Sequence, residues 1–143
     1  VEPAKMLVDY KIWCFNGVPE SVLVVFDRNG EDYKLSVFDL EWNNISDRTL
    51  RTDSPHYGGL DIQKPASFDE MIATAKKLSS GFPEVRVDFY DINGQAIFGE
   101  LTFSTGYGYF TDEYYSYLGN MVDIQSVKRI ATEDIISSIK IGK

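Results

Sequence analysis

The fold is decided by the segment from Val85 to Phe103, which reads VRVDFYDINGQAIFGELTF. Both halves of it are rich in β-branched and aromatic residues, and the Asn93-Gly94 pair between them is a strong hairpin signal. The segment therefore predicts two antiparallel strands, over residues 84–91 and 95–103. Since side chains along a strand point alternately to opposite faces of a sheet, the pattern also predicts which residues share a face.

The two strands separate apolar from polar side chains at a period of two. On the first strand the sets are Val85, Val87 and Phe89 against Arg86, Asp88 and Tyr90; on the second they are Ile97, Leu101 and Phe103 against Phe98, Glu100 and Thr102. A two-residue turn would place Glu100 opposite Val87, on the apolar face. Burial of one face fixes the register of a hairpin. We therefore predict a three-residue loop, 92–94, or a bulge with the same effect on parity, with Arg86 opposite Glu100 and Asp88 on the diagonal.

One sheet face then carries Arg86, Asp88, Glu100 and Thr102. The pattern allows two interpretations. The face is either solvated, with a cross-strand ion pair between Arg86 and Glu100, or it holds a divalent metal ion. Mg²⁺ commonly takes one or two protein carboxylates together with phosphates and water. An arginine beside the carboxylates could hold a planar anion such as an acyl phosphate.

The remaining elements predict an α+β domain, an antiparallel β-sheet with flanking helices. Three further strands are expected over 8–15, 20–27 and 33–40, followed by a long segment without clear period over 41–66. Residues 68–80 have helical spacing of apolar residues, and Ser67 and Glu70 have the spacing of a capping box. Two short helices are expected near 112–118 and 133–140.

Composition excludes several classes of protein. The chain has 143 residues, with 14 basic and 22 acidic ones and a formal net charge of −8, so a nucleic-acid partner is not expected. No apolar run reaches the roughly 18 residues of a membrane span, and no signal peptide is present, so we expect a cytoplasmic protein. The single cysteine, Cys14, is interpreted as a core residue rather than half of a catalytic pair with His56.

Several motifs together resemble the ATP-grasp family, in its teichuronopeptide-biosynthesis (TupA-like) branch. The family pattern Arg-x-Asp-Phe, a short turn and Glu-x-Asn is similar to the run from Arg86 to Thr102. Upstream, the resemblance extends to segments 9–17, 27–28, 38–42 and 71–83, and overall it covers about residues 8–119. ATP-grasp ligases phosphorylate a carboxylate with ATP, and an amine then attacks the acyl phosphate. The resemblance implies ATP and Mg²⁺ as cofactors.

The resemblance also implies roles for individual residues. Asp88 and Glu100 would be Mg²⁺ ligands, and Arg86 would steady the acyl phosphate. The nucleotide would be bound by Lys11, which would approach its phosphates, by Glu2 near the adenine-binding hinge, and by Thr102. Thr102 stands where the family has asparagine, and a hydroxyl is a weaker ligand than an amide oxygen.

The resemblance further implies that residues 1–143 form a single domain, the C-terminal lobe of an ATP-grasp fold, with an extension from about residue 120. The N-terminal lobe and its phosphate-covering loop would precede Val1, so we expect the chain alone to be inactive as a ligase. In this branch, whose members are often labelled glycosyltransferases, the expected substrates are an amine and a carboxylate such as a uronic acid of a cell-envelope polysaccharide.

A non-catalytic carbohydrate- or protein-binding module is the alternative. It would use an aromatic cluster formed by Tyr107, Tyr109, Phe110, Tyr114, Tyr115 and Tyr117. The same aromatic residues could instead pack a helix against the sheet.

Overall fold

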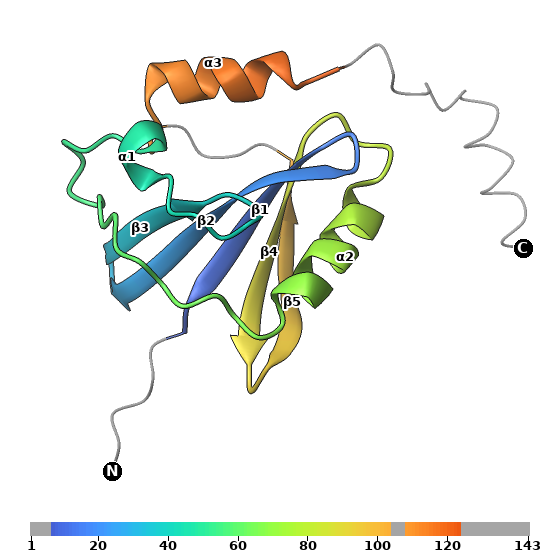
Figure 1. Cartoon of the computed structure of the whole chain (residues 1–143), viewed down its shortest axis with the longest axis horizontal. Helices are drawn as coiled ribbons and strands as arrows, with labels where there is room; N and C mark the ends of the chain where they lie inside the picture. Colours follow the sequence, from blue (N-terminus) through green and yellow to red (C-terminus); the bar gives the residue numbers. More distant parts are fainter. Residues whose placement is uncertain (1–6, 104–107, 124–143) are drawn as a thin grey trace, which may run out of the picture.

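A computed structural model describes residues 7–103 and 108–123 of the chain. Five antiparallel strands form one sheet in the order β3-β2-β1-β4-β5 (Figure 1). The elements along the chain are β1 (Asp9–Phe15), β2 (Val18–Asn29), β3 (Asp32–Phe38), α1 (Ser46–Thr49), α2 (Phe68–Ser79), β4 (Val85–Ile92), β5 (Gln95–Thr102) and α3 (Asp112–Asn120). The predicted α+β fold is confirmed. The helix predicted near 133–140 lies outside the described residues.

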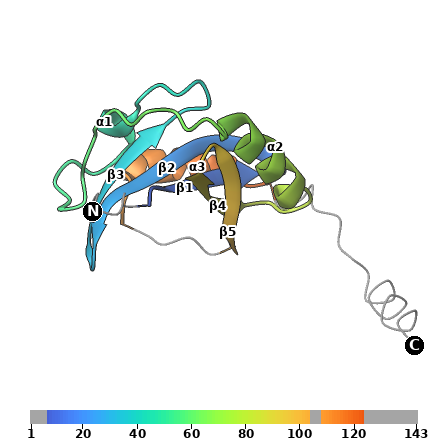
Figure 2. The same cartoon turned by 90° about the horizontal axis from the view of Figure 1, so that it is seen from below.

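Alternate residues of β1 define the two faces of the sheet. Tyr10, Ile12 and Cys14 join the core cluster under α2, which also contains Met71 and Ala75; we call this side the α2 face. Trp13 and Phe15 join a second cluster with residues of α3, and this side is the α3 face. Figure 2 shows the sheet edge-on with the helices around it. Within the described residues, no helix has the length and apolar character that crossing a membrane requires.

The β4–β5 hairpin differs from its predicted register. Asn93 and Gly94 both have positive φ, 54° and 79°, as a two-residue type I′ turn requires, and Ile92 pairs with Gln95. The predicted three-residue loop is therefore wrong. The alternative, a bulge with the same effect on parity, is confirmed, because the register shifts between Asp88 and Phe89.

The bulge leaves Gly99 as the extra residue of β5, so Asp88 lies opposite Glu100 and Arg86 opposite Thr102. The predicted pairing of Arg86 with Glu100 is therefore wrong, and those two residues are diagonal neighbours. The shift also exchanges two side chains: Ile97 pairs with Tyr90, on the α3 face, and Phe98 pairs with Phe89, on the α2 face.

The side chains at the start of α2 hydrogen-bond to the β4–β5 hairpin and do not cap the helix's own backbone. Ser67 donates from its backbone N and from Oγ to Asp91 Oδ2, at 3.0 and 2.6 Å. Glu70 Oε2 accepts from the backbone N of Ala96 at 3.2 Å. The predicted capping box is therefore wrong, because both side chains make long-range contacts that a local motif does not show.

The long segment before α2 contains α1 and is held against the sheet. Trp42 stacks on Phe38 with ring centroids 4.4 Å apart and meets Phe68 of α2 edge to face. Its indole Nε1 donates to the carbonyl of Ile62 at 2.8 Å. These contacts replace regular secondary structure in fixing the path of the segment.

Candidate functional site

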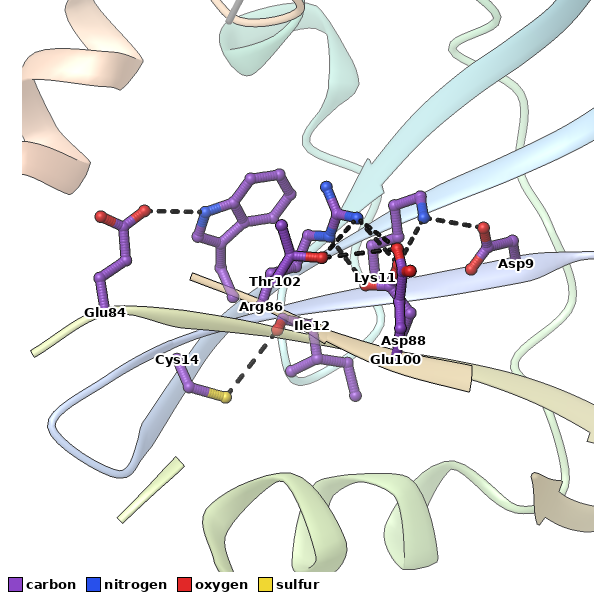
Figure 3. A network of polar contacts seen from close by, with 10 residues as sticks. Asp9, Lys11, Ile12, Cys14, Glu84, Arg86, Asp88, Glu100 and Thr102 are labelled. Atoms are coloured by element: carbon purple, nitrogen blue, oxygen red, sulfur yellow. Dashed lines mark hydrogen bonds and ion pairs between the residues drawn. The ribbon is translucent and has the colours of Figure 1, made fainter. Parts of the chain in front are cut away.

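Polar side chains from three neighbouring strands meet on the part of the α3 face formed by β1, β4 and β5 (Figure 3). Lys11 comes from β1 and lies opposite Asp88 of β4. Asp88 in turn lies opposite Glu100 of β5. Together with Arg86 and Thr102 they form what we call the polar row. The structure therefore brings together five of the six site residues predicted from the sequence, while the sixth, Glu2, lies outside the described residues.

Asp88 is the centre of the polar row. Its carboxylate accepts two hydrogen bonds from Arg86, from Nε to Oδ1 at 2.7 Å and from Nη2 to Oδ2 at 2.9 Å. Lys11 Nζ donates to the same Oδ2 at 2.6 Å. The side chain of Asp88 is 4% exposed, against 10% for Arg86 and 14% for Lys11. Two cations thus compensate one buried carboxylate, and such pairs are strong when they are bidentate.

Glu100 and Thr102 form the solvent side of the polar row. Arg86 Nη2 lies 3.4 Å from Glu100 Oε1 and 3.2 Å from Thr102 Oγ1. The Glu100 side chain is 64% exposed, so this contact contributes little to stability. Glu100 therefore has acceptor capacity left for a ligand from solution.

Asp9 is a member of the row that the sequence analysis missed. Its Oδ2 lies 2.8 Å from Lys11 Nζ, so Lys11 is held between two carboxylates, those of Asp9 and Asp88. Its other oxygen, Oδ1, is buried without a hydrogen-bond partner among the described residues, which is costly for a carboxylate. Parity alone places Asp9 beside Lys11, since residues two apart on one strand share a face.

The donor set fits Mg²⁺ in part. Among the described residues no three His, Cys, Asp or Glu side chains come together as a metal cage. Mg²⁺ does not need one, because it is usually held by one or two carboxylates plus phosphates and water. Asp88 and Glu100 supply two carboxylates from opposite positions of neighbouring strands. Glu100 is exposed and open to a metal ion that arrives with a phosphate ligand, whereas the buried Asp88 carboxylate could join it only by giving up a contact to Lys11 or Arg86.

The other candidate residues lie elsewhere. Cys14 lies on the α2 face, and His56 stacks on Tyr33 with ring centroids 3.8 Å apart, so they do not form a catalytic pair. The turn 104–108 lies almost wholly outside the described residues. A cavity of about 630 Å³ lies between segment 62–66 and the turn at Asn93, and its lining includes no residue of the polar row.

The thiol of Cys14 is expected to be inert in the native protein. Burial raises its pKa to about 11, and only the thiolate reacts. A thiol reagent at pH 8 should therefore label Cys14 in denaturant and leave it unlabelled in buffer over the same time. Because the native pKa is the higher one, the contribution of this thiol to stability is complete below the unfolded pKa and falls as the pH rises toward 11. Rapid labelling of the native chain, followed by mass spectrometry, would contradict this account.

Most of the aromatic cluster near α3 packs the helix onto the sheet. Phe110 is fully buried and Tyr114 nearly so, with Tyr114 Oη donating to Ser21 Oγ at 2.9 Å. Burial raises the pKa of Tyr114. Tyr117 is half exposed, and Tyr107 lies outside the described residues. The larger part of the cluster is thus core rather than a surface for sugar stacking.

Comparison with known proteins identifies the family. The family model described as TupA-like ATPgrasp matches residues 1–123, which include the whole polar row. Searches of curated proteins and of solved structures returned no match. The resemblance of the hairpin and its flanking segments is thus confirmed, and the chain belongs to the TupA-like ATP-grasp family.

Proposed function

We propose that the chain is the metal- and phosphate-binding part of an ATP- and Mg²⁺-dependent carboxylate–amine ligase. The observation that carries the proposal is the pairing of Asp88 with Glu100 on the same face, with Arg86 and Lys11 both bound to Asp88. Two carboxylates beside two cations suit a complex of metal and polyphosphate, in which both signs of charge must be matched. Membership of the family supports the same conclusion.

The reaction requires the protein to neutralise the negative charges of the phosphates and to align the reacting groups. An oxygen of the substrate carboxylate attacks the γ-phosphorus of ATP, and ADP leaves. The amine then attacks the carbonyl carbon of the acyl phosphate, inorganic phosphate leaves, and the amine loses a proton to solvent or base. Bound Mg²⁺ would supply neutralisation of the phosphate charge. Arg86, whose planar guanidinium suits bidentate contacts, would orient the acyl phosphate.

Lys11 would exchange partners when the nucleotide binds. It shares Oδ2 of Asp88 with Arg86, so a metal ion at Asp88 would compete with its ammonium group. Asp9 Oδ2, 2.8 Å from Lys11 Nζ, would keep that group close by. The ammonium group could then turn to a phosphate oxygen without leaving its pocket. Asp9 and Lys11 thus act as a unit that positions one positive charge.

The substrates and the rest of the fold belong to the same proposal. We propose that a second ATP-grasp lobe closes over the polar row and completes the nucleotide site, so that residues 1–143 alone do not ligate. The carboxylate substrate would be a uronic acid or similar group of a cell-envelope polysaccharide, as in the branch that the chain resembles.

Glu100→Gln tests this proposal with little risk to the fold, because the side chain is largely exposed. We expect it to weaken binding of a Mg²⁺–ATP analogue at least about tenfold, since loss of groups around a metal commonly costs 10–100-fold, with an unchanged melting temperature. Isothermal titration with and without Mg²⁺ measures this, in the full-length parent if the 143-residue chain binds too weakly. Glu31→Gln, which removes the same charge from the exposed β2–β3 turn, is the control.

Equal affinity of the Glu100→Gln and Glu31→Gln variants would overturn the proposal. It would favour the alternative, a non-catalytic binding module whose exposed aromatic residues, such as Tyr117, contact a partner.

A further inference from the structure

A small aromatic recess lies beyond the Arg86 end of the polar row. Its volume is about 140 Å³, and its lining includes Trp13, Phe15, Phe110 and Tyr115 together with one charged residue, Glu84. The recess is formed where the C-terminal half of β1 and the residue before β4 meet α3. By size it could hold a group comparable to benzene, which occupies an apolar cavity of about 150 Å³ in another protein.

The recess is built on fixed contacts. Phe110 meets Trp13 edge to face with ring centroids 5.3 Å apart, and it meets Tyr115 in the same way at 5.2 Å. Tyr115 Oη accepts from the backbone N–H groups of Gly108 and Tyr109, at 2.8 and 3.1 Å. The walls of the recess are thus ordered by packing and hydrogen bonds before any ligand binds, which lowers the entropic cost of binding.

Glu84 gives the recess its chemical preference. Its Oε1 accepts a hydrogen bond from Trp13 Nε1 at 3.3 Å (Figure 3), and it forms no salt bridge with any Lys or Arg in the described part of the chain. Glu84 is half-buried, so its charge is only partly solvated. Trp13, Phe15 and Phe110 are only 1–3% exposed, so the accessible aromatic wall is mainly that of the partly exposed Tyr115. An aromatic ring beside a carboxylate attracts an organic cation, through the ring quadrupole and through direct charge pairing.

Trp13 connects the recess to the polar row. The Arg86 guanidinium lies over its indole ring, with Cζ 5.5 Å from the ring centroid, while Glu84 binds the indole N–H. A ligand seated at Glu84 therefore approaches the position of the acyl phosphate from the side opposite to Asp9 and Lys11.

We propose that this recess binds an alkylammonium group. On the proposed ligase function, on which this second step rests, the group belongs to the amine substrate. That substrate then carries two basic groups: one ammonium held by Glu84 and the aromatic walls, and one nucleophilic nitrogen presented toward Arg86. Glu84 is a specificity-determining residue in this scheme, and it takes no part in the transfer of the phosphoryl group.

The indole N–H signals of the 143-residue chain test the recess directly by NMR. The chain has two tryptophans, and Trp42, which donates to Ile62 in the cluster under α2, serves as an internal reference; Trp42→Phe assigns the pair. Titration with tetramethylammonium chloride at constant chloride should shift the Trp13 signal saturably and leave the Trp42 signal in place. tert-Butanol is similar in size but uncharged, so at equal concentration it should shift the Trp13 signal at least about tenfold less.

Two variants complete the test. Glu84→Gln should raise the dissociation constant for tetramethylammonium roughly tenfold, whereas Glu31→Gln should leave it unchanged. Gly119→Leu should be accepted by the backbone, because an added Cβ would meet no atom within 4 Å, and since Gly119 lines the recess we expect weaker tetramethylammonium binding. Equal binding of tert-butanol, or equal dissociation constants for Glu84→Gln and Glu31→Gln, would overturn the proposal.

These outcomes are separable from those of the ligase proposal. Alkylammonium binding needs neither ATP nor Mg²⁺, and Glu84→Gln should leave affinity for the Mg²⁺–ATP analogue unchanged. Loss of nucleotide binding in Glu100→Gln with intact alkylammonium binding supports both proposals independently. The chain could also bind tetramethylammonium while Glu100→Gln leaves nucleotide affinity unchanged. That result would keep the alkylammonium site and remove its assignment to a ligase substrate.

Discussion

Asp88→Asn should lower the free energy of unfolding by about 3 kcal/mol and abolish measurable binding of a Mg²⁺–ATP analogue. Removing one partner from a buried ion pair leaves the other charge uncompensated, which typically costs 3–5 kcal/mol. The low end applies here because Lys11 keeps Asp9, and Arg86 keeps its contacts to Glu100 and Thr102. Asparagine also retains one acceptor oxygen.

Thermal and urea unfolding measure the first effect, and calorimetric titration measures the second. For a domain of this length 3 kcal/mol corresponds to a decrease of about 10 °C in melting temperature. Glu100→Gln is the matched comparison, since it removes the opposite carboxylate from the exposed side of the polar row and should leave the melting temperature unchanged. A Glu100 variant as unstable as the Asp88 variant would show that the two carboxylates do not have the separate roles argued above.

The strands and the main helix could be predicted because each carries its own pattern. Runs of β-forming residues bounded by turn signals identified all five strands, and the stripe of Phe68, Met71 and Ala75 identified α2. Which side chains of β4 share a face also followed from parity alone, since burial of Val85 and Val87 forces Arg86 and Asp88 to the other side.

What could not be predicted depends on residues far apart in the sequence. Ser67 and Glu70 fit a local capping motif, but Asp91 and the backbone of Ala96 bind them instead. Parity places Asp9 on the same face as Lys11, but the contact between them gains its importance from Asp88, which is 77 residues from Lys11 in the sequence. The four-residue helix α1 is too short to leave a periodic signal.

The candidate site shows the same division. Parity placed Asp88 and Glu100 on one face, but it could not say which residue was directly opposite which. The location of the bulge decides which residues pair. The bulge lies at Gly99, but the sequence pattern allows it at several positions along the strand. Glu84 was missed because it becomes part of a recess only where α3 packs beside it. That helix begins more than twenty residues further along the chain.

Gly99→Val should therefore damage the site from a position that makes no contact with a ligand. A Cβ on Gly99 would lie 3.2 Å from the carbonyl oxygen of Asp88 and 3.3 Å from Tyr90 Cε2, which is tighter than most Cβ contacts in proteins. The backbone oxygen cannot move without disturbing the β4–β5 ladder. Overpacking of this kind costs about 1–3 kcal/mol. Because the bulge sets Glu100 opposite Asp88, affinity for the Mg²⁺–ATP analogue should fall by at least about tenfold as well.

Deletion of Gly99 separates the crowding from the register. Without the extra residue, Phe98 stays opposite Phe89 and Glu100 stays opposite Asp88, so the two strands pair regularly with every side chain on its present face. The deletion should accordingly retain nucleotide affinity within about threefold, a difference below 1 kcal/mol, while valine at the same position loses it. If the deletion removed binding as completely as valine does, the bulge itself, and not the facing of the two carboxylates, would be what the site requires.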